Sequence, residues 1–450
     1  MEYTLNRTVS LNEAYEVIVC GGGPAGCAAA ISAAREGAKT LLIETSGMLG
    51  GMSTLGLVNA LPHSIREDRV IYGGIAEKIA SQLRPYMEDW RNNNHGWLPI
   101  DFEQLKLIYD EMVTSAGADV LFYSHVAGVE MKDDRNIDVV LVANKAGITA
   151  YRAKVFIDCT GDADLYAWAG KEYIDGNGKG QYMAGTMCFA LTGVKDGKID
   201  EAYARYDPEE GHHRRKYMVA KIFEDGKYHI GDRHFVPRKF GDGAVSFNAG
   251  HVYGLNALDP VSLSEGTMEG RRIANDWYKA LKEYAPEAFS ESILVQTAPS
   301  VGIRESRRII GDYVFTVEDY LARAVFPDEV YRGRYHVDVH DEDITQDSRT
   351  DLVYEQLGHE ESYGVPYRVM CPRDLDNVLV AGRTMSSDRM ANGCLRVMSS
   401  CMCAGEACGM AAKYAADMEN VNIHKVDTQV LRKRLMEEGA VLPKQETDTF

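Results

Sequence analysis

Hydrophobic and polar positions near the N-terminus form short apolar runs around one alanine-rich run. Residues 16–20 and 38–44 are apolar enough to form buried strands, whereas residues 28–36 between them favour a helix. Strand, helix and strand follow one another within about thirty residues, which is the spacing of a parallel βαβ unit. This order predicts an α/β fold built on a parallel sheet.

Periodicity also divides the rest of the chain. Helical spacing of apolar residues over 71–90 and 102–117 is followed by alternation within 118–159, which predicts a β-meander on the same domain. Residues from about 185 to 365 lack this pattern and mix aromatics, charged helices and polar loops, which suits an inserted α+β substrate domain. The predicted organisation is a discontinuous Rossmann-like cofactor domain (1–184 and 366–450, the latter with C-terminal helices) that encloses the substrate domain (185–365).

A glycine-rich turn joins the first predicted strand to the first helix. Gly21, Gly23 and Gly26 fill the pattern G-x-G-x-x-G directly after the apolar run. In such a turn the first glycine permits the bend, the second lets the backbone approach a pyrophosphate, and the third lets helix and strand pack closely. Glu44 ends the second strand, where an acid holds the ribose hydroxyls of a dinucleotide. The pattern predicts a dinucleotide site and leaves NAD and FAD open.

Three further segments narrow this choice. The paired glycines of MLGGMSTLG (48–56) would let a loop run close to a ligand, and AKVFIDCTGDADL (153–165) contains a second buried strand that ends in a turn. The strand NVLVAGR, within 375–417, precedes a helix rich in glycine and alanine. With these segments the sequence resembles FAD-dependent oxidoreductases of the glutathione-reductase-like FAD fold, akin to the flavoprotein subunits of fumarate reductase and succinate dehydrogenase.

The resemblance implies FAD as the cofactor and a set of residues that contact it. The implied FAD-contacting residues are Gly21, Gly23, Pro24, Ala25, Gly26, Glu44, Thr45, Gly50, Gly51, Met52, Asn59, Val126, Thr160, Gly161, Asp162, Gly382, Arg383, Arg396, Val397 and Met398. A second glycine fingerprint for NAD(P)H is not found, since GNGKG at 176–180 follows a polar stretch and is predicted as a loop. We therefore expect FAD to be the only dinucleotide held in a dedicated domain.

Charge and composition restrict the partners. The net charge of −18 disfavours nucleic acid, because phosphate backbones are bound by clustered cations. The N-terminal residues contain no apolar signal core and no window approaches eighteen apolar residues, so we expect a cytoplasmic protein without a membrane span. The expected partners are a small-molecule substrate and an unspecified electron donor or acceptor, and the oligomeric state is left open.

Cysteines and histidines offer several metal-ligand types, but their spacing does not favour a metal site. The nine cysteines are odd in number and match no disulfide framework or metal cluster, so reduced thiols are expected. Cys394, Cys401 and Cys408 repeat every seven residues, as one face of a helix would. In YHVDVHDED (335–343), period-two alternation places two histidines and an aspartate on one face of a predicted strand, where a polar wall is favoured over a metal. No metal site is predicted.

A flavin performs hydride transfer itself, so the protein must supply a group for the accompanying proton. The candidates are Arg304, His251, His340 and Tyr367. Arg304 begins RESRR, a cluster that resembles an arginine-rich stretch of the family, and both substrate contact and internal salt bridging remain open for it. Further candidates for proton handling, substrate contact or the flavin surroundings are His63, His336, Asp338, Asn59, Arg389 and Asn392.

The sequence predicts an FAD-dependent oxidoreductase that transfers a hydride between flavin N5 and a small, polar substrate such as a sugar, cyclitol or hydroxy acid. The His and Arg motifs with which fumarate reductases clamp dicarboxylates cannot be placed here, so dicarboxylate reduction is not expected. Two alternatives stay open. One is a flavin-dependent tRNA-modifying protein, which opens with a similar glycine turn but is opposed by the acidic charge, and the other is a non-catalytic flavin redox sensor.

Overall fold

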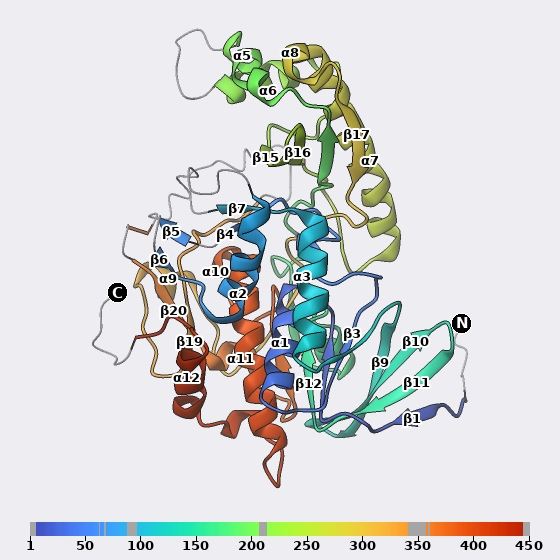
Figure 1. Ribbon diagram of the computed structural model, residues 1–450. Coiled ribbons are helices and arrows are strands. Elements are labelled where there is room, and N and C mark those ends of the chain that lie inside the picture. The colour runs from blue at the N-terminus through green and yellow to red at the C-terminus, as the bar shows by residue number, and fades with distance from the viewer. Residues whose placement is uncertain are drawn as a thin grey trace.

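A parallel five-stranded sheet lies at the centre of the molecule and takes its strands from both ends of the chain (Figure 1). The computed structural model describes residues 6–62, 64–66, 69–87, 97–206, 214–340, 357–358 and 361–443. The sheet order is β21 (Val378–Val380), β12 (Val155–Asp158), β2 (Val17–Cys20), β3 (Thr40–Ile43) and β8 (Asp119–Leu121). The first four of these strands are fully buried, as expected for a parallel sheet that is covered on both faces. The α/β prediction is confirmed.

Helix α1 (Pro24–Arg35) connects β2 to β3 and confirms the predicted βαβ unit. The helix begins before the predicted residue 28, because Pro24 fits the first helical turn and the extended Gly23 precedes it. Helices α2 (Gly74–Leu83) and α3 (Phe102–Ser115) lie within or close to the predicted ranges, although α2 is shorter than 71–90 and residues 88–90 lie outside the described part.

The predicted β-meander is present beside the parallel sheet. Strands β9 (His125–Asp133), β10 (Asn136–Asn144) and β11 (Gly147–Arg152) pair antiparallel in chain order, and β1 (Ser10–Asn12) adds to β11 in parallel. The buried face of β10 packs against the parallel sheet, since Val140 and Val142 belong to the same apolar cluster as Ile18.

A second, antiparallel sheet stands above the parallel one in Figure 1. Its order is β15 (Phe235–Gly241), β16 (Ala244–Ala249), β14 (Phe189–Thr192) and β17 (Ile293–Thr297), and the long helix α7 (Pro260–Tyr284) contacts β17. Helices α5 (Ile199–Ala204), α6 (Arg214–Asp225) and α8 (Pro286–Phe289) gather at its far end. All these elements come from the predicted insertion, whose boundaries at 184/185 and 365/366 stay a prediction.

Smaller elements complete the described fold. They are β4 (Ala60–Pro62), β5 (Ser64–Arg66), β6 (Arg69–Val70), β7 (Trp97–Pro99), α4 (Asp164–Trp168), β13 (Tyr173–Asp175), β18 (Arg307–Ile309), α9 (Val317–Leu321), β19 (Glu329–Gly333), β20 (Tyr363–Pro366) and α12 (Thr428–Glu437). Within the described ranges, no helix is both long enough and apolar enough to cross a membrane.

The strand predicted over 335–343 is wrong. Strand β19 ends at Gly333, and residues 334–340 belong to neither a helix nor a strand, whereas 341–343 lie outside the described residues. Side chains hold this segment instead of a neighbouring strand. The Tyr72 hydroxyl accepts hydrogen bonds from the backbone N–H groups of Arg334 and Tyr335, both at 3.2 Å.

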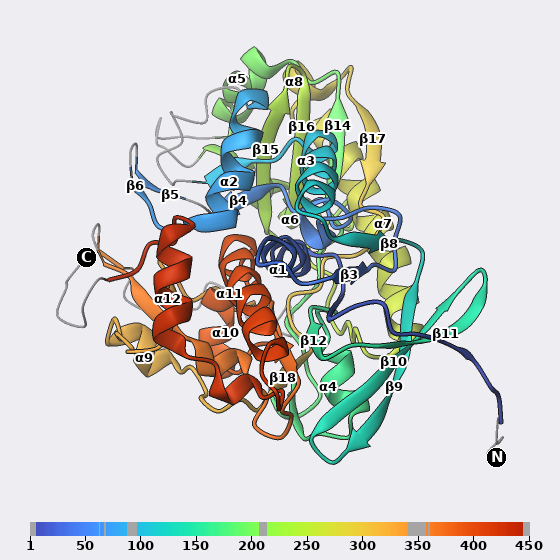
Figure 2. The same ribbon diagram turned by 60° about the horizontal axis from the view of Figure 1, so that its bottom comes forward.

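Helix α1 packs against α11 (Met398–Ala416) with the two backbones in direct contact (Figure 2). A Cβ atom on Gly405 would lie 2.0 Å from the Ala25 carbonyl oxygen, and one on Gly409 would lie 2.3 Å from that of Ala29. Both contacts advance by four residues along each helix, so the helices run parallel. Ser32 adds a hydrogen bond from its hydroxyl to the Glu406 carbonyl oxygen at 2.8 Å.

The nine cysteine side chains are all buried. Cys401 and Cys408 lie on α11, whereas Cys394 lies on the preceding helix α10 (Arg389–Leu395), so the seven-residue spacing spans two helices. Burial raises the pKa of the Cys401 thiol to about 12, which keeps it protonated at neutral pH. These thiols are therefore small packing groups.

Replacing Gly405 with alanine tests the helix contact. We expect the free energy of unfolding to fall by about 2 kcal/mol, because the new methyl group forces the two backbones apart. The measurement is urea denaturation followed by circular dichroism. Gly197→Ala is the control, since a Cβ there meets no atom within 4 Å. Equal stability of the two variants would contradict a close helix contact.

Glu406 supplies a pH-dependent contact on the same helix. Its Oε2 accepts a hydrogen bond from the Ile75 N–H at 2.9 Å, near the start of α2, and burial raises the pKa of the carboxyl to about 7. Because the folded-state pKa lies above the unfolded-state value, its stabilising contribution is complete at acidic pH and is lost as the pH rises through about 7.

Glu406→Gln should therefore flatten the fall in unfolding free energy between pH 5 and pH 8, by about 3 kcal/mol for the fully buried group. The amide keeps an acceptor for Ile75 but does not titrate in this range. Denaturation curves at closely spaced pH values measure the difference. Parallel pH profiles of the wild-type protein and the variant would show that Glu406 is ionised in the fold.

Candidate active site

In the glycine turn after β2, protein atoms lie close to Gly21 and Gly26, whereas the space at Gly23 is open. A Cβ on Gly21 would lie 2.3 Å from the Cys159 carbonyl oxygen, and one on Gly26 would lie 1.7 Å from that of Gly21. At Gly23 a Cβ would meet no protein atom within 4 Å. Gly23 precedes α1 in an extended conformation, and no side chain caps this helix N-terminus. The turn therefore leaves open space in front of uncapped N–H groups, which is what an anionic phosphate requires.

Glu44 and the loop at 48–56, called here the paired-glycine loop, lie against this turn. The two Glu44 carboxylate oxygens accept hydrogen bonds from the Gly22 N–H at 2.7 Å and the Ser46 N–H at 2.6 Å. A Cβ on Gly51 would lie 2.9 Å from the Gly23 Cα, so the loop approaches the turn directly. Thr45 is exposed and Met52 is half-buried.

The ends of β12 and β21 meet next to α1. Arg383 Nη2 donates to Asp162 Oδ1 at 2.8 Å, and its guanidinium lies against Gly161, where a Cβ would be 3.1 Å from Cζ. Gly382 has φ +112° and lies beside Ala25. Thr160 lies two residues after Asp158, the last residue of β12, and its hydroxyl donates to the Asp158 carboxylate.

Two predicted FAD contacts lie in other settings. Val126 is half-buried in β9, opposite Val142. Asn59 is buried, and its Nδ2 donates to the carbonyl oxygens of Val236 at 2.8 Å and Ser246 at 3.3 Å. The predicted cofactor domain (1–184 and 366–450), which carries the parallel sheet, is called here the cofactor-binding part. The Asn59 side chain therefore joins the cofactor-binding part to the antiparallel sheet.

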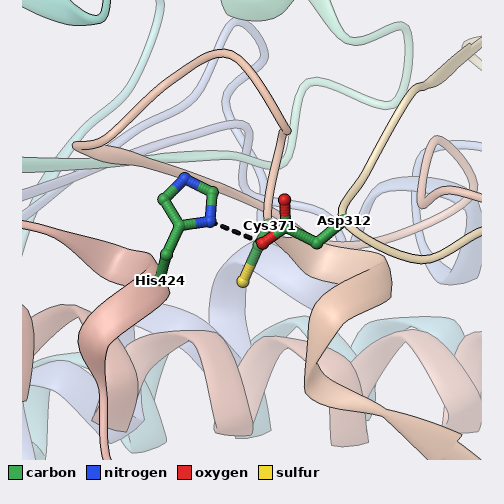
Figure 3. A group of neighbouring side chains, drawn as sticks. All are labelled: Asp312, Cys371 and His424. Carbon is green, nitrogen blue, oxygen red and sulfur yellow. Dashed lines mark hydrogen bonds and ion pairs between the residues drawn. The ribbon is translucent and has the colours of Figure 1, made fainter.

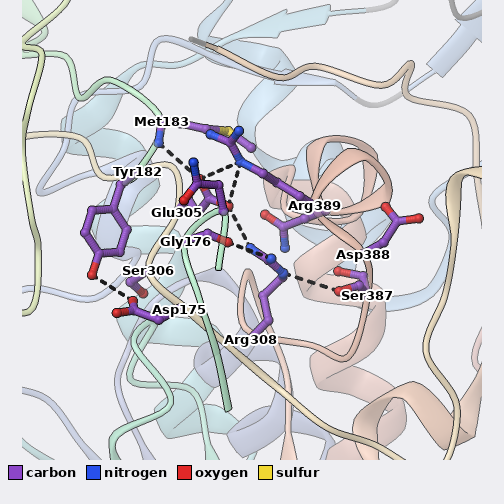
Figure 4. Close-up of polar contacts among 12 residues, drawn as sticks. Asp175, Gly176, Tyr182, Met183, Glu305, Ser306, Arg308, Ser387, Asp388 and Arg389 are labelled. Atoms are coloured by element: carbon purple, nitrogen blue, oxygen red, sulfur yellow. Dashed lines mark hydrogen bonds and ion pairs between the residues drawn. The ribbon is translucent and has the colours of Figure 1, made fainter. Parts of the chain in front are cut away.

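The arginine-rich stretch divides into a structural part and a separate arginine. Glu305 is fully buried and binds Arg308 Nη1 at 2.7 Å and Arg389 Nε at 3.2 Å, and it accepts from the Met183 N–H at 3.0 Å (Figure 4). Arg307 pairs with Asp164 on α4 at 2.9 Å. These ion pairs hold the stretch against the cofactor-binding part, so the salt-bridge interpretation describes Arg307 and Arg308.

A compact group of three histidine rings, called here the histidine cluster (His234, His251 and His340), lies beside the antiparallel sheet. The centroids of His234 and His251 are 4.5 Å apart, and that of His340 is 4.8 Å from His251. His251 Nδ1 is hydrogen-bonded to Asp232 Oδ2, and the Tyr253 hydroxyl donates to the same oxygen at 2.8 Å. The other ring nitrogen of His251, Nε2, is buried and has no hydrogen-bond partner among the residues that the structure describes.

Segment 334–340 brings an acid and a base to this cluster. Asp338 Oδ1 lies 3.3 Å from His340 Nε2, and Asp338 Oδ2 accepts from Arg396 Nη2 at 3.0 Å. Gly393 lets the segment approach α10, since a Cβ there would be 2.7 Å from the Asp338 backbone nitrogen. Of the three side chains predicted to share one face of a strand, Asp338 and His340 are in contact, whereas the His336 ring stacks on Tyr335.

Burial keeps the histidine cluster neutral. It lowers the pKa of His340 to about 3, to which the charge of Arg304 contributes. Burial also lowers the pKa of His234 and of His251, although the hydrogen bond to Asp232 opposes the shift at His251. In Asp232, burial alone would raise the pKa, but the contact with His251 holds it below the usual range. An ionised Asp232 fixes the His251 proton on Nδ1 and leaves a lone pair on Nε2.

The residues just before Arg304 contact two segments that were predicted to contact the cofactor. The Ser300 N–H donates to the Leu55 carbonyl in the paired-glycine loop at 3.3 Å, and Arg383 Nη1 donates to the Ile303 carbonyl at 3.4 Å. Arg396, which binds Asp338, directly precedes Val397 at the uncapped N-terminus of α11. The charge of Arg304 contributes to the low pKa of His340, so Arg304 lies near the histidine cluster.

Several predicted residues are not in this cluster. The Tyr367 hydroxyl donates to the Ile423 carbonyl at 3.0 Å, so its oxygen is engaged in the core. Asn392 donates to the Arg383 carbonyl at 2.7 Å, and the His336 ring stacks on Tyr335. His63 lies outside the described residues.

Asp312, Cys371 and His424 form a separate polar group, and their ligand-type atoms lie within 4.8 Å of one another (Figure 3). His424 Nε2 donates to the Leu375 carbonyl at 2.9 Å, and Nδ1 is 2.6 Å from Asp312 Oδ2. Burial opposes a charge on the ring, but Asp312 raises the pKa of His424 above its usual value. An imidazolium that donates from both nitrogens accounts for this geometry. A surface pocket of 390 Å³ adjoins it, lined by Arg135, Asp312, Arg373, Asp376, Asn422, His424 and Lys425.

Comparison with known proteins identifies the family. The sequence model described as "FAD dependent oxidoreductase" matches residues 16–435. The chain belongs to this family. The resemblance to FAD-dependent oxidoreductases is thereby confirmed, the cofactor is FAD, and the protein is an oxidoreductase.

Curated relatives match only part of the chain. A digeranylgeranylglycerophospholipid reductase of Picrophilus torridus is 32% identical over 173 residues, 35% of this chain and 42% of that protein. The reductase of the same name from Thermoplasma volcanium is 28% identical over 174 residues, with the same coverage. The chain thus spans less than half of the length of these relatives.

Solved structures are similar over a longer range at lower identity. A geranylgeranyl bacteriochlorophyll reductase-like protein of Thermoplasma acidophilum has a TM-score of 0.45 and 15% identity, with 95% of this chain and 84% of that chain covered. A p-nitrophenol 4-monooxygenase of Pseudomonas putida has a TM-score of 0.44 and 12% identity, with 95% and 86% covered.

The described residues fit FAD on structural grounds. The open space at Gly23 and the uncapped start of α1 suit the pyrophosphate, and the uncapped start of α11 gives a second set of free N–H groups. The individual FAD contacts predicted from the sequence remain predictions.

Sequence reasoning missed Asp232, His234 and Tyr253 as members of the site. The motif D-x-H at 232–234 offers two polar side chains of the correct type. No local pattern, however, indicates that His251 folds back onto Asp232, because the two residues flank the hairpin of β15 and β16.

Gly23→Val tests the cofactor site. The side chain enters open space in the protein alone, so folding should be retained, whereas FAD retention should be lost because the valine fills the space of the pyrophosphate. Flavin absorbance per mole of purified protein is the measurement. Gly128→Ala is the control, since a Cβ there makes only an ordinary contact with Leu141 at 3.8 Å. Full flavin content in Gly23→Val would refute the assignment.

Proposed function

We propose that this oxidoreductase interconverts a carbinol and a carbonyl in a small polar substrate, with His251 as the group that accepts or returns the hydroxyl proton. When bound, FAD supplies the acceptor or donor of the hydride. The observation that carries the proposal is the buried Nε2 of His251, which has no hydrogen-bond partner within the described part of the chain while Nδ1 is held by Asp232. An oriented imidazole with a free lone pair is suited to take a proton at neutral pH.

The neighbouring groups support a substrate with hydroxyl groups. Neutral imidazoles such as those of His234 and His340 each offer one donor and one acceptor, which matches a hydroxyl. Arg304 adds a positive charge that would stabilise a developing alkoxide. A long apolar substrate would leave these buried polar groups unpaired, at a cost in binding.

The experiment that tests this proposal is an anaerobic screen for flavin bleaching with polyols, sugars, cyclitols and hydroxy acids. With a reducing substrate found, His251→Asn should slow bleaching by about 10² to 10⁴-fold, because the proton has no acceptor. FAD content should stay unchanged. The control is His229→Asn, which changes an exposed histidine paired with Glu269.

Two outcomes would contradict the proposal. Bleaching at the wild-type rate in His251→Asn would remove His251 from proton transfer. A lack of bleaching by every substrate, together with a lack of reoxidation of the dithionite-reduced protein by the corresponding carbonyl compounds, would favour a flavin redox sensor without turnover.

A further inference from the structure

Arg304 is a buried cation whose hydrogen-bond partners are neutral. Its Nη1 donates to the Ala184 carbonyl oxygen at 2.6 Å and to Thr186 Oγ1 at 2.9 Å, and 9% of the residue is exposed. Among the described residues, no carboxylate forms an ion pair with Arg304, and its Nε and Nη2 make no hydrogen bond to them. By contrast, Arg307 and Arg308 in the same stretch each have a carboxylate partner.

The carboxylates near Arg304 contact other residues. Asp232 is hydrogen-bonded to His251, and Asp338 contacts both His340 and Arg396. With the histidine cluster neutral, Asp338 balances the charge of Arg396 by direct contact, whereas Asp232 acts on Arg304 only at a distance. Burial, with a further contribution from Arg396, lowers the pKa of Arg304 to about 10, which reflects poor compensation of its charge.

We propose that the substrate is a hydroxy acid with one carboxylate, which binds Arg304 while its hydroxyl group contacts Nε2 of His251. This inference rests on the proposed function. A carboxylate would give the free nitrogens of Arg304 a charged acceptor, and guanidinium groups bind carboxylates through paired hydrogen bonds. Buried charges in proteins are generally paired in this way.

The charge and hydrogen-bond pattern selects a monoanion. Arg396 already has a carboxylate partner, because its Nη2 donates to Oδ2 and to the carbonyl oxygen of Asp338, so its charge is compensated before a substrate binds. A phosphate ester would bring close to two negative charges at pH 7 to one uncommitted guanidinium. The neutral rings of His234 and His340 each have Nε2 on a protein oxygen, Asn248 Oδ1 and Asp338 Oδ1, so only Nδ1 of each ring is left to meet a hydroxyl group.

The oxidation balances with the groups present. The carbinol C–H bond breaks and its hydrogen leaves with both electrons as hydride to FAD, while the O–H proton moves to His251 Nε2. The carbon–oxygen single bond becomes a double bond, so the hydroxy acid becomes an oxo acid and the cofactor gains two electrons. The reverse direction uses the same groups, with His251 returning the proton.

The test compares anions with neutral analogues of the same shape in the purified FAD-loaded protein. The rate of anaerobic bleaching is compared between lactate and propane-1,2-diol, between glycerate and glycerol, and between gluconate and sorbitol. The monoanion 2-hydroxy-2-methylpropanoate, which has no hydrogen on its carbinol carbon, serves as a binding probe through its perturbation of the flavin absorption spectrum. We expect bleaching by at least one hydroxy acid at least tenfold faster than by its neutral analogue, and a saturable perturbation by this probe.

Arg304→Met and Arg304→Lys separate charge from packing. In Arg304→Met, the affinity for 2-hydroxy-2-methylpropanoate should fall by about tenfold or more, the loss expected for a charge-assisted hydrogen bond, and Arg304→Lys should recover part of it. Arg432→Met is the matched control, because Arg432 is also buried and donates to the backbone carbonyls of Glu329 and Pro443. Flavin content and unfolding curves establish that each variant is folded.

The failures of the two proposals differ. Bleaching by neutral polyols that depends on His251 but is not increased by a carboxylate would overturn the hydroxy-acid inference and leave the proposed function standing. A perturbation by 2-hydroxy-2-methylpropanoate that is absent, or that is equal in wild-type protein and Arg304→Met, would likewise overturn it. A perturbation that is lost in Arg304→Met without bleaching by any tested acid would show an anion site at Arg304 but overturn both the proposed function and the hydroxy-acid substrate.

Discussion

The backbone contact between α1 and α11 is the constraint on which the rest of the structure depends. Glycines at 405 and 409 allow the two helices to touch at Ala25 and Ala29, and the contacts advance in the same direction along both helices. Met398, where α11 starts, lies seven residues before Gly405, so at 1.5 Å per residue α11 extends about 10 Å beyond the start of α1. The two uncapped N-termini are thus offset along the common direction of the helices, which suits a dinucleotide whose phosphates and flavin ring are separated.

The position of α11 also determines where the candidate chemistry lies. Arg396, just before the helix, binds Asp338 and so fixes the segment that carries His340. The stretch that begins with Arg304 is fixed in turn by buried ion pairs to the cofactor-binding part. The histidine cluster therefore combines residues next to the antiparallel sheet with a residue whose segment is held by the cofactor-binding part, although these residues are far apart in the sequence.

Local sequence patterns predicted the elements whose formation depends on neighbouring residues. The βαβ unit, the glycine turn and the meander follow from apolar runs, glycines and alternation within short windows, and all three are present. Residues 335–340 show the limit of such patterns. This segment is held by Tyr72 through the backbone of Arg334 and Tyr335 and by Arg396 through Asp338, and not by pairing with a strand.

The candidate site was only partly predictable for the same reason. Arg304, His251 and His340 were identified individually by residue type, but no spacing in the sequence shows that they converge. Asp232 was not identified, since its role depends on the fold of the hairpin that brings it to His251. Long-range packing, which determines such convergence, leaves little trace in a single sequence.

A crystal structure of the protein with bound FAD would test the central claim most directly. The account predicts that the reactive face of the flavin ring is turned towards His251 Nε2 and Arg304, with space between them for one small molecule. The adenine and phosphates would lie along the turn at Gly23. A flavin ring that faces away from the histidine cluster, or a cluster sealed from the flavin by protein atoms, would contradict the account.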